Sequence, residues 1–171
     1  MSLKDVSAQW DGKTIEPMLQ VYDINKADPA FGPELLKSLG DIKSERGITW
    51  LVKHHLEQGW RPQSNRETSV ILKALPGTNH WEAHLHLLQC LPYLTIASRQ
   101  TEHLWDHLQS AIQDEAKFVR AWAYHGLYVL AAQHPRFSAQ VLEILKRGLD
   151  TETAASAKVK IRHALKSLAF D

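Results

Sequence analysis

DEAKFVRAWAYHGLYVL, residues 114–130, carries small or apolar side chains at every third or fourth position. These side chains are Val119, Ala123, Gly126, Leu127 and Leu130. An α-helix turns once in about 3.6 residues, so this spacing places them on one side of a helix. Other segments repeat the spacing, Gly and Pro lie mainly between them, and no segment alternates as a strand does. The stretch therefore predicts an amphipathic helix in an all-α protein.

The same spacing predicts nine helices along the chain. We expect them near residues 13–24, 33–40, 44–58, 64–75, 80–94, 101–113, 117–133, 138–148 and 154–169. We expect residues 1–12 to form an N-terminal arm or a short helix, and residues 13–171 to form one domain of helical repeats. The length of 171 residues allows one domain with a substantial apolar core.

The pattern around Leu127 recurs along the chain. Its counterparts are Leu56, Leu91 and Leu165, which follow one another at intervals of 35 to 38 residues. Two further apolar columns lie four and eight residues before these leucines: Val52, Leu87, Ala123 and Ile161, then Ile48, Ala83, Val119 and Ala157. A period of about 36 residues is typical of stacked helix pairs, because one pair cannot bury its apolar sides alone.

These columns resemble the HEAT-repeat family. Residues 114–123 have its acid near the turn, its Val-Arg pair and its spaced alanines, and residues 33–41 resemble a first helix. The resemblance covers roughly residues 30–169, but three repeats replace Arg120 by Thr49, His84 and Lys158. It implies a short right-handed superhelix of antiparallel helix pairs, with an armadillo-like solenoid as the structural alternative. It says little about activity.

Composition excludes several classes of function. The net charge is +1, so no strong overall field attracts nucleic acid or an anionic membrane. Cys90 is the only cysteine, which excludes an internal disulfide, and its repeat column suggests a small core residue. The N-terminal residues lack the apolar segment of a secretory signal, and no apolar run is long enough to span a membrane. We therefore expect a cytoplasmic protein that does not bind membranes.

A polar column predicts a binding surface. The HEAT resemblance implies that the second helices line the concave side, where partners are held. Two residues before each repeat leucine, roughly opposite the apolar columns, the sequence has three histidines and a glutamine. With two flanking aromatic residues, the predicted partner-binding set is Trp50, His54, Gln89, His125, Tyr128 and His163. We expect it to hold a protein or peptide; the alternative interpretation is a row of tolerated surface residues.

A basic stripe supplies a second hypothesis. Lys158, Arg162 and Lys166 lie four residues apart in the last predicted helix, and such a stripe could contact phosphate groups. Some HEAT-like proteins are DNA alkylation glycosylases, so a nucleic-acid-binding or DNA-repair protein is the alternative function. The structural alternative is a charged outer side on the last repeat.

No catalytic or metal-binding signature occurs. Two histidine pairs have helical spacing, His80 with His84 and His103 with His107, but neither comes with the further ligands of a zinc motif. Walker, dinucleotide and nucleophile-elbow motifs are absent. We therefore predict no cofactor, no metal and no catalytic residue. The leading hypothesis is a non-enzymatic protein-interaction module, a scaffold or adaptor.

Overall fold

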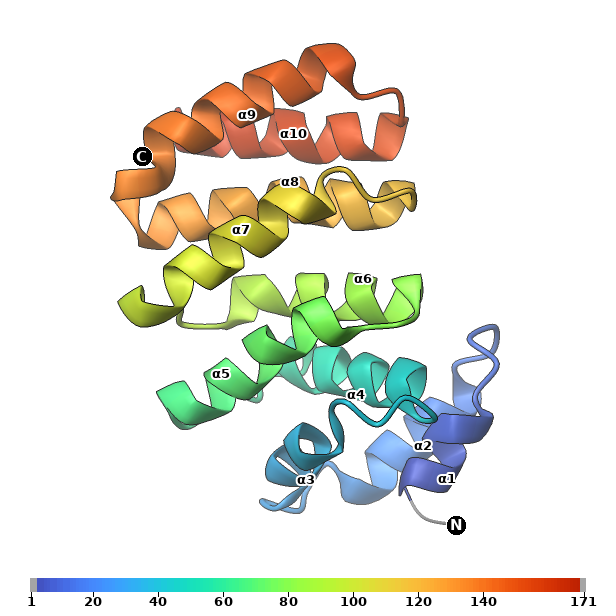
Figure 1. The fold of residues 1–171 in the computed structure, drawn as a ribbon. Helices are drawn as coiled ribbons and strands as arrows, with labels where there is room; N and C mark the ends of the chain where they lie inside the picture. Colours follow the sequence, from blue (N-terminus) through green and yellow to red (C-terminus); the bar gives the residue numbers. More distant parts are fainter. Residues whose placement is uncertain (1–2, 170–171) are drawn as a thin grey trace. The chain divides into compact units, whose positions relative to one another are not determined.

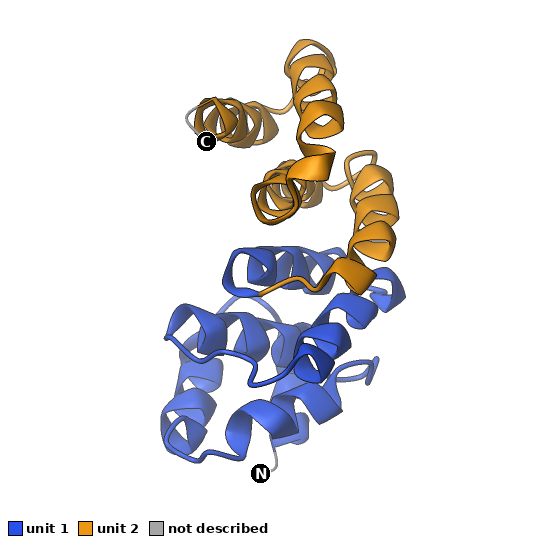
Figure 2. Ribbon diagram, turned by 90° about the vertical axis from the view of Figure 1, so that its left-hand side faces the viewer, with its two compact units in different colours: residues 1–94 blue, residues 95–171 orange. Residues whose placement is uncertain are grey.

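The computed structural model describes residues 3–169, and this part of the chain forms ten α-helices and no strand (Figure 1). The all-α prediction is confirmed. The chain groups into two compact units, which Figure 2 colours separately. Unit 1 comprises residues 1–94 and unit 2 residues 95–171. No helix in the described range is long and apolar enough to cross a lipid bilayer.

Unit 1 is organised around α4, which contacts α1, α2, α3 and α6. The fully buried side chains of α4 include Ile48, Leu51 and Leu56, so this helix forms the centre of the apolar core. The helix α5 contacts α3 and α6. The bounds in unit 1 are α1 Leu3–Gln9, α2 Glu16–Asn25, α3 Phe31–Ser38, α4 Glu45–Glu57, α5 Asn65–Ala74 and α6 Trp81–Cys90.

Unit 2 consists of two layers of helices. The helices α8 and α10 pack side by side, and α7 and α9 lie against them (Figure 1). Small buried residues, Ala123 on α8 with Ala157 and Ala164 on α10, allow the close approach. The bounds in unit 2 are α7 Thr101–Ala111, α8 Lys117–Gln133, α9 Ser138–Thr151 and α10 Ala155–Leu168.

The repeat columns are core positions in both units. Every residue of the two columns upstream of the repeat leucines is at most 1% exposed. The leucines Leu56, Leu91 and Leu127 are fully buried, whereas Leu165 in the last helix is half-buried. Equivalent sequence positions thus occupy equivalent environments within each unit, apart from this terminal leucine.

Two glutamates accept hydrogen bonds from the backbone N–H groups that immediately precede α6 and α10. In unit 1 the Glu45 carboxylate accepts hydrogen bonds from the backbone of Asn79 and His80, before α6. In unit 2 the Glu152 carboxylate accepts from Thr153 and Ala154, before α10. Both glutamates are less than 10% exposed. A carboxylate placed here compensates N–H groups that have no partner within the helix.

Several helix ends differ from the prediction, and prolines explain the largest differences. The helix expected over 80–94 ends at Cys90 and continues as a 3₁₀ turn, Leu91–Tyr93, because Pro92 cannot donate the next helical hydrogen bond. The helix expected from residue 13 begins at Glu16, which places Pro17 in the first turn, where a missing N–H is tolerated. Residues 3–9 form α1, one more helix than the nine expected from residue 13 onward.

Candidate functional site

Aromatic and basic side chains meet where α8 and α10 lie side by side. Trp122, His125 and Tyr128 follow one another at three-residue intervals, which places them along one side of α8. Lys160 and His163 have the same spacing on α10. His163 is exposed and the other four are half-buried. We call these five residues the α8–α10 face.

The rings of α8 contact one another in sequence. The centroids of Trp122 and His125 are 5.2 Å apart with the rings nearly perpendicular, at 82°. The His125 and Tyr128 centroids are 5.7 Å apart. Edge-to-face geometry of this kind is favourable between aromatic rings. The structure therefore brings together two predicted site residues, His125 and Tyr128, and adds Trp122 to them.

Lys160 lies over the indole of Trp122. Its Nζ is 3.8 Å from the ring centroid, a cation–π distance. Partial burial lowers the pKa of Lys160 below its ordinary value. In the part of the chain that the structure describes, no carboxylate forms an ion pair with this ammonium group, and α10 itself contains no acidic residue. The cation therefore rests on an aromatic surface without a countercharge.

His125 is uncharged at neutral pH. Its pKa is lowered to about 4, mainly by burial and to a smaller degree by Lys160 and His163. A neutral imidazole offers one donor and one acceptor nitrogen. Among the described residues, His125 Nδ1 is buried and has no hydrogen-bond partner. The neutral ring therefore adds no second positive charge beside Lys160.

Three more predicted site residues lie in unit 1, and only two of them, Trp50 and His54, are in contact. Trp50 and His54 lie on α4 with their rings stacked, 4.8 Å between centroids and 14° between planes. Tyr22 packs edge-on against His54 at 4.5 Å. Gln89 is half-buried on α6. Burial lowers the pKa of His54, while the nearby Glu57 carboxylate opposes that shift.

A segment of the chain covers Trp50. Trp10, between α1 and α2, has its ring 5.9 Å from that of Trp50 and 6.4 Å from that of His86. Its indole Nε1 donates to the Thr14 carbonyl at 2.5 Å. Trp50 is consequently only 8% exposed. A partner could reach the Trp50 ring only if the segment around Trp10 moved.

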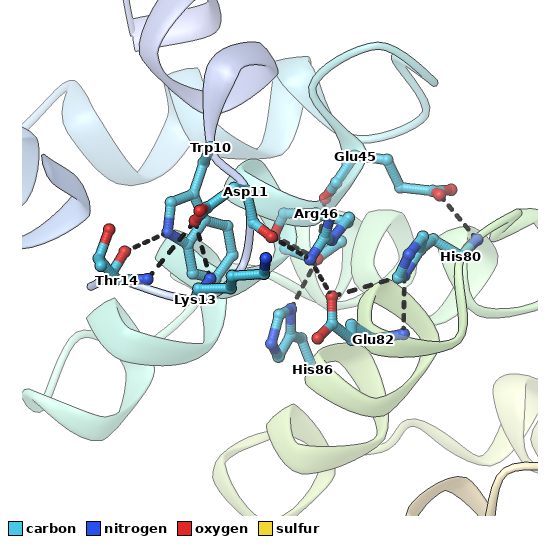
Figure 3. A network of polar contacts seen from close by, with 10 residues as sticks. Trp10, Asp11, Lys13, Thr14, Glu45, Arg46, His80, Glu82 and His86 are labelled. Atoms are coloured by element: carbon cyan, nitrogen blue, oxygen red, sulfur yellow. Dashed lines mark hydrogen bonds and ion pairs between the residues drawn. The ribbon is translucent and has the colours of Figure 1, made fainter.

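Polar contacts hold this segment in place (Figure 3). Arg46 on α4 donates through Nη2 to the Asp11 carbonyl at 2.9 Å, and the same nitrogen forms an ion pair with Glu82 on α6. Gly12 has φ +77°, a conformation that favours glycine, and a Cβ there would collide with the Arg46 guanidinium. The segment is therefore shaped to accept Arg46 beneath it.

His86 on α6 also lies against the Trp10 ring and is part of this covered group of side chains. Its Nδ1 is 3.1 Å from the Thr49 hydroxyl, and its side chain is 9% exposed. Burial lowers the pKa of His86 to about 3, with smaller contributions from Lys53 and Arg46. The ring is therefore neutral near pH 7 and packs as part of the core of unit 1.

The basic stripe faces away from Lys160. Lys158, Arg162 and Lys166 are four residues apart, so they advance only about 40° around α10 at each step. Lys160 is about 200° from Lys158 by the same count. Arg162 and Lys166 are exposed and Lys158 is half-buried. The stripe and the α8–α10 face are thus separate surfaces of one helix.

The cysteine and histidines considered as a nucleophile or as metal ligands make contacts that belong to the fold. Cys90 is fully buried, its thiol donates to the His86 carbonyl at 3.2 Å, and burial raises the pKa of the thiol. This confirms the expected core position and opposes nucleophilic use. The His80 side chain accepts from the Glu82 backbone N–H at the start of α6. Within residues 3–169, no three His, Cys, Asp or Glu side chains gather as a metal site would require.

Sequence reasoning missed Lys160 and Trp122 as site residues. In the sequence Lys160 is only two residues from Lys158 and Arg162 of the basic stripe, and Trp122 is one of several tryptophans inside predicted helices. The available signal was the three-residue spacing from Trp122 to His125, together with a final helix that contains bases and no acid. The contact between them depends on the packing of α10 against α8, which the repeat pattern alone does not specify.

Comparison of the chain with protein-family models, curated proteins and solved structures finds no match.

Proposed function

We propose that the protein is a non-enzymatic protein-interaction module that binds a protein or peptide segment on its second helices, with the α8–α10 face as the principal site. One observation carries the proposal: Lys160 lies 3.8 Å above a half-buried tryptophan with no carboxylate paired to it among the described residues. Tryptophan, tyrosine and cationic side chains in partly desolvated surroundings supply much of the affinity of protein interfaces.

The architecture we propose for each unit is that of HEAT-like helix pairs. Supporting it, α4 packs against α6 in unit 1 and α8 against α10 in unit 2, so second helices are neighbours in both. The repeat columns supply the buried residues of these contacts. In such an architecture the second helices present a continuous row of side chains to a partner.

Peptide selection tests the proposal directly. A displayed library of random peptides is selected on the full chain, and enriched sequences are synthesised and titrated against the wild type and Trp122→Ala. We expect micromolar dissociation constants that weaken about tenfold or more in the variant, the size of a typical hot-spot loss. Trp81→Ala, which removes a tryptophan that is 45% exposed on α6, is the matched control and should leave affinity unchanged. No enrichment, or equal losses in both variants, would contradict the proposal.

Nucleic-acid binding by the stripe Lys158, Arg162 and Lys166 is the competing function. The favouring observation is that α10 carries three lysines, one arginine and no acid. A protein of this kind should bind duplex DNA near 50 mM salt, with affinity that falls steeply as salt increases. Weak binding that a Lys158→Gln/Arg162→Gln variant does not change would exclude the stripe as a nucleic-acid site.

A further inference from the structure

The repeat register relates the two units residue by residue. Counting back from the repeat leucine, His86 and Lys160 are both five residues upstream on their helices. Arg46 and Lys117 are both ten residues upstream, on α4 and α8. Nine residues upstream on α6 and α10, the register places Glu82 in unit 1 and Ser156 in unit 2. The two units can therefore be compared at matching positions.

In unit 1 these positions hold a Trp-Asp segment of the same chain. The Trp10 ring lies against the rings of Trp50 and His86, and Arg46 binds the carbonyl of Asp11 (Figure 3). The segment brings an aromatic ring and a backbone carbonyl to the surface. Its carboxylate is not needed there, because Glu82 already neutralises Arg46.

In unit 2 the matching positions are more positive. Lys117 and Lys160 replace Arg46 and His86, and Ser156 replaces the neutralising Glu82. In the described chain neither lysine forms an ion pair; Lys160 lies over Trp122, and Lys117 Nζ is 5.2 Å from the Phe118 centroid. Two unneutralised cations beside exposed aromatic surface are complementary to a negatively charged aromatic ligand.

We infer that the α8–α10 face binds an acidic peptide segment in which an aromatic residue lies beside Asp or Glu, its ring on Trp122 and His125 and its carboxylate on Lys160. This inference depends on the proposed function and specifies the ligand of that same site. The Trp10–Asp11 segment of unit 1 shows that an aromatic residue followed by an acid can lie against such a surface, and the charge of Lys160 is what assigns the carboxylate of the ligand in unit 2.

The test uses the full chain and defined fluorescent peptides. One probe has a central Trp-Asp-Glu flanked by Gly and Ser, a second has Trp-Asn-Gln at the same place, and a third has Ala-Asp-Glu. A single-stranded oligothymidylate of similar length is the nucleic-acid probe. Dissociation constants are measured by fluorescence anisotropy for the wild type, Lys160→Gln, Lys160→Arg and Lys146→Gln. Lys146 lies on α9 with a 59% exposed side chain, so its variant is the matched control.

We expect the acidic aromatic probe to bind the wild type about tenfold more tightly than either altered probe, because each lacks one of the two interactions. Lys160→Gln should abolish the preference for acid over amide, Lys160→Arg should keep most of it, and Lys146→Gln should leave it unchanged. Lys160 is half-buried on the surface, so its variants should retain the helical circular dichroism of the wild type.

Other outcomes overturn the inference in distinguishable ways. Peptides selected on the protein that need Trp122 but show no preference for acid would leave the proposed function in place and exclude the acidic ligand. Tighter binding of oligothymidylate than of the acidic peptide would assign the face to nucleic acid. A concentration-dependent dimer in light scattering that the acidic peptide does not dissociate would make a second copy of the chain the occupant.

Discussion

The covered surface of unit 1 and the half-buried surface of unit 2 share the matching positions His54/His125 and His86/Lys160, but their tryptophans lie at different repeat positions and their chemistry differs. In unit 1 the aromatic rings of α4 and α6 are closed over by Trp10, and Arg46 is paired with Glu82. In unit 2 Trp122 remains half-buried, and Lys160 has no ion-pair partner among the described residues. Unit 1 pairs its aromatic and charged groups internally, whereas in unit 2 the Trp122 ring is the contact that the described structure gives the Lys160 ammonium group.

This difference separates structural histidines from candidate binding residues. His54 stacks on Trp50, which the N-terminal segment covers, and His86 lies against Trp10 of that segment. His125 occupies the position of His54, two residues before the repeat leucine, yet its neighbours are Trp122, Tyr128 and a free cation. Residues in one repeat column therefore have the same orientation relative to the apolar core, but they need not have the same function. The role depends on what the rest of the chain places above the column.

The largest expected effect concerns the buried repeat leucines, one in the core of each unit. Leu56→Ala and Leu127→Ala should each lower the free energy of unfolding by about 2–5 kcal/mol, because both leucines are fully buried. Leu165→Ala, at a half-buried position, should lose less, about 1–2 kcal/mol. Urea unfolding followed by circular dichroism measures all three. A loss below about 1 kcal/mol at Leu127 would contradict the repeat equivalence.

The next effect concerns an ion pair of unit 2. Arg120 donates to Glu152 through Nε and Nη2 at 2.8 and 2.9 Å, and the glutamate side chain is only 4% exposed. Glu152→Gln should lower the free energy of unfolding by about 2–3 kcal/mol at pH 7, because it leaves Arg120 unpaired. Urea unfolding measures the loss.

The same pair gives the stability a defined pH dependence. The hydrogen bond from Arg120 is the main cause that lowers the pKa of Glu152 from 4.5 to about 2. A lowered folded-state pKa contributes stability above pH 4.5, and this contribution is lost as the pH falls toward 2. The wild type should therefore lose more stability than Glu152→Gln over this range. Equal acid sensitivity of the two proteins would contradict the assignment.

Removing the Trp10 side chain should have a smaller effect on the free energy of unfolding and should uncover the aromatic surface of unit 1. Trp10→Ala removes the ring that covers Trp50 and His86, and we expect a loss of about 1–3 kcal/mol, since Trp10 is half-buried. The uncovered Trp50 should become accessible to acrylamide quenching. Unchanged quenching of the remaining tryptophans would mean that Trp10 does not control access to this surface.

The smallest effect on stability is expected at Lys160 itself. Lys160→Gln should change the free energy of unfolding by no more than about 1 kcal/mol, because a cation–π contact but no ion pair is lost in the described structure. Its effect on ligand binding should be much larger. A destabilisation above about 1 kcal/mol would make Lys160 a structural residue and weaken its assignment to a ligand.

The sequence predicted the helices well where periodicity and end signals agree. The prediction for α8, residues 117–133, matches its observed bounds, because apolar spacing is continuous from Val119 to Leu130 and Pro135 follows. The prediction for the helix from residue 80 ran past Cys90, because the apolar pattern continues through Leu91 and Leu94 although Pro92 interrupts the hydrogen bonding. The missing N–H of Pro92, and not the apolar spacing, therefore determines where α6 ends.

The candidate site was only partly predictable. His125 and Tyr128 were identified because they share a helix side with a repeated column, and that information lies along the chain. The covering of Trp50 by Trp10 and the placement of Lys160 over Trp122 connect segments at least 38 residues apart in the sequence. Such contacts depend on how helices pack and how a loop folds back, which apolar spacing does not encode.

The most direct test follows the tryptophan indole N–H and histidine ring signals by NMR while the acidic aromatic peptide is added to the full chain. We expect the chemical shifts of Trp122 and His125 to change first and to saturate together, while those of Trp10 and Trp50 remain unchanged. Shifts confined to Trp10 and Trp50, or none at Trp122, would show that the α8–α10 face is not the binding site.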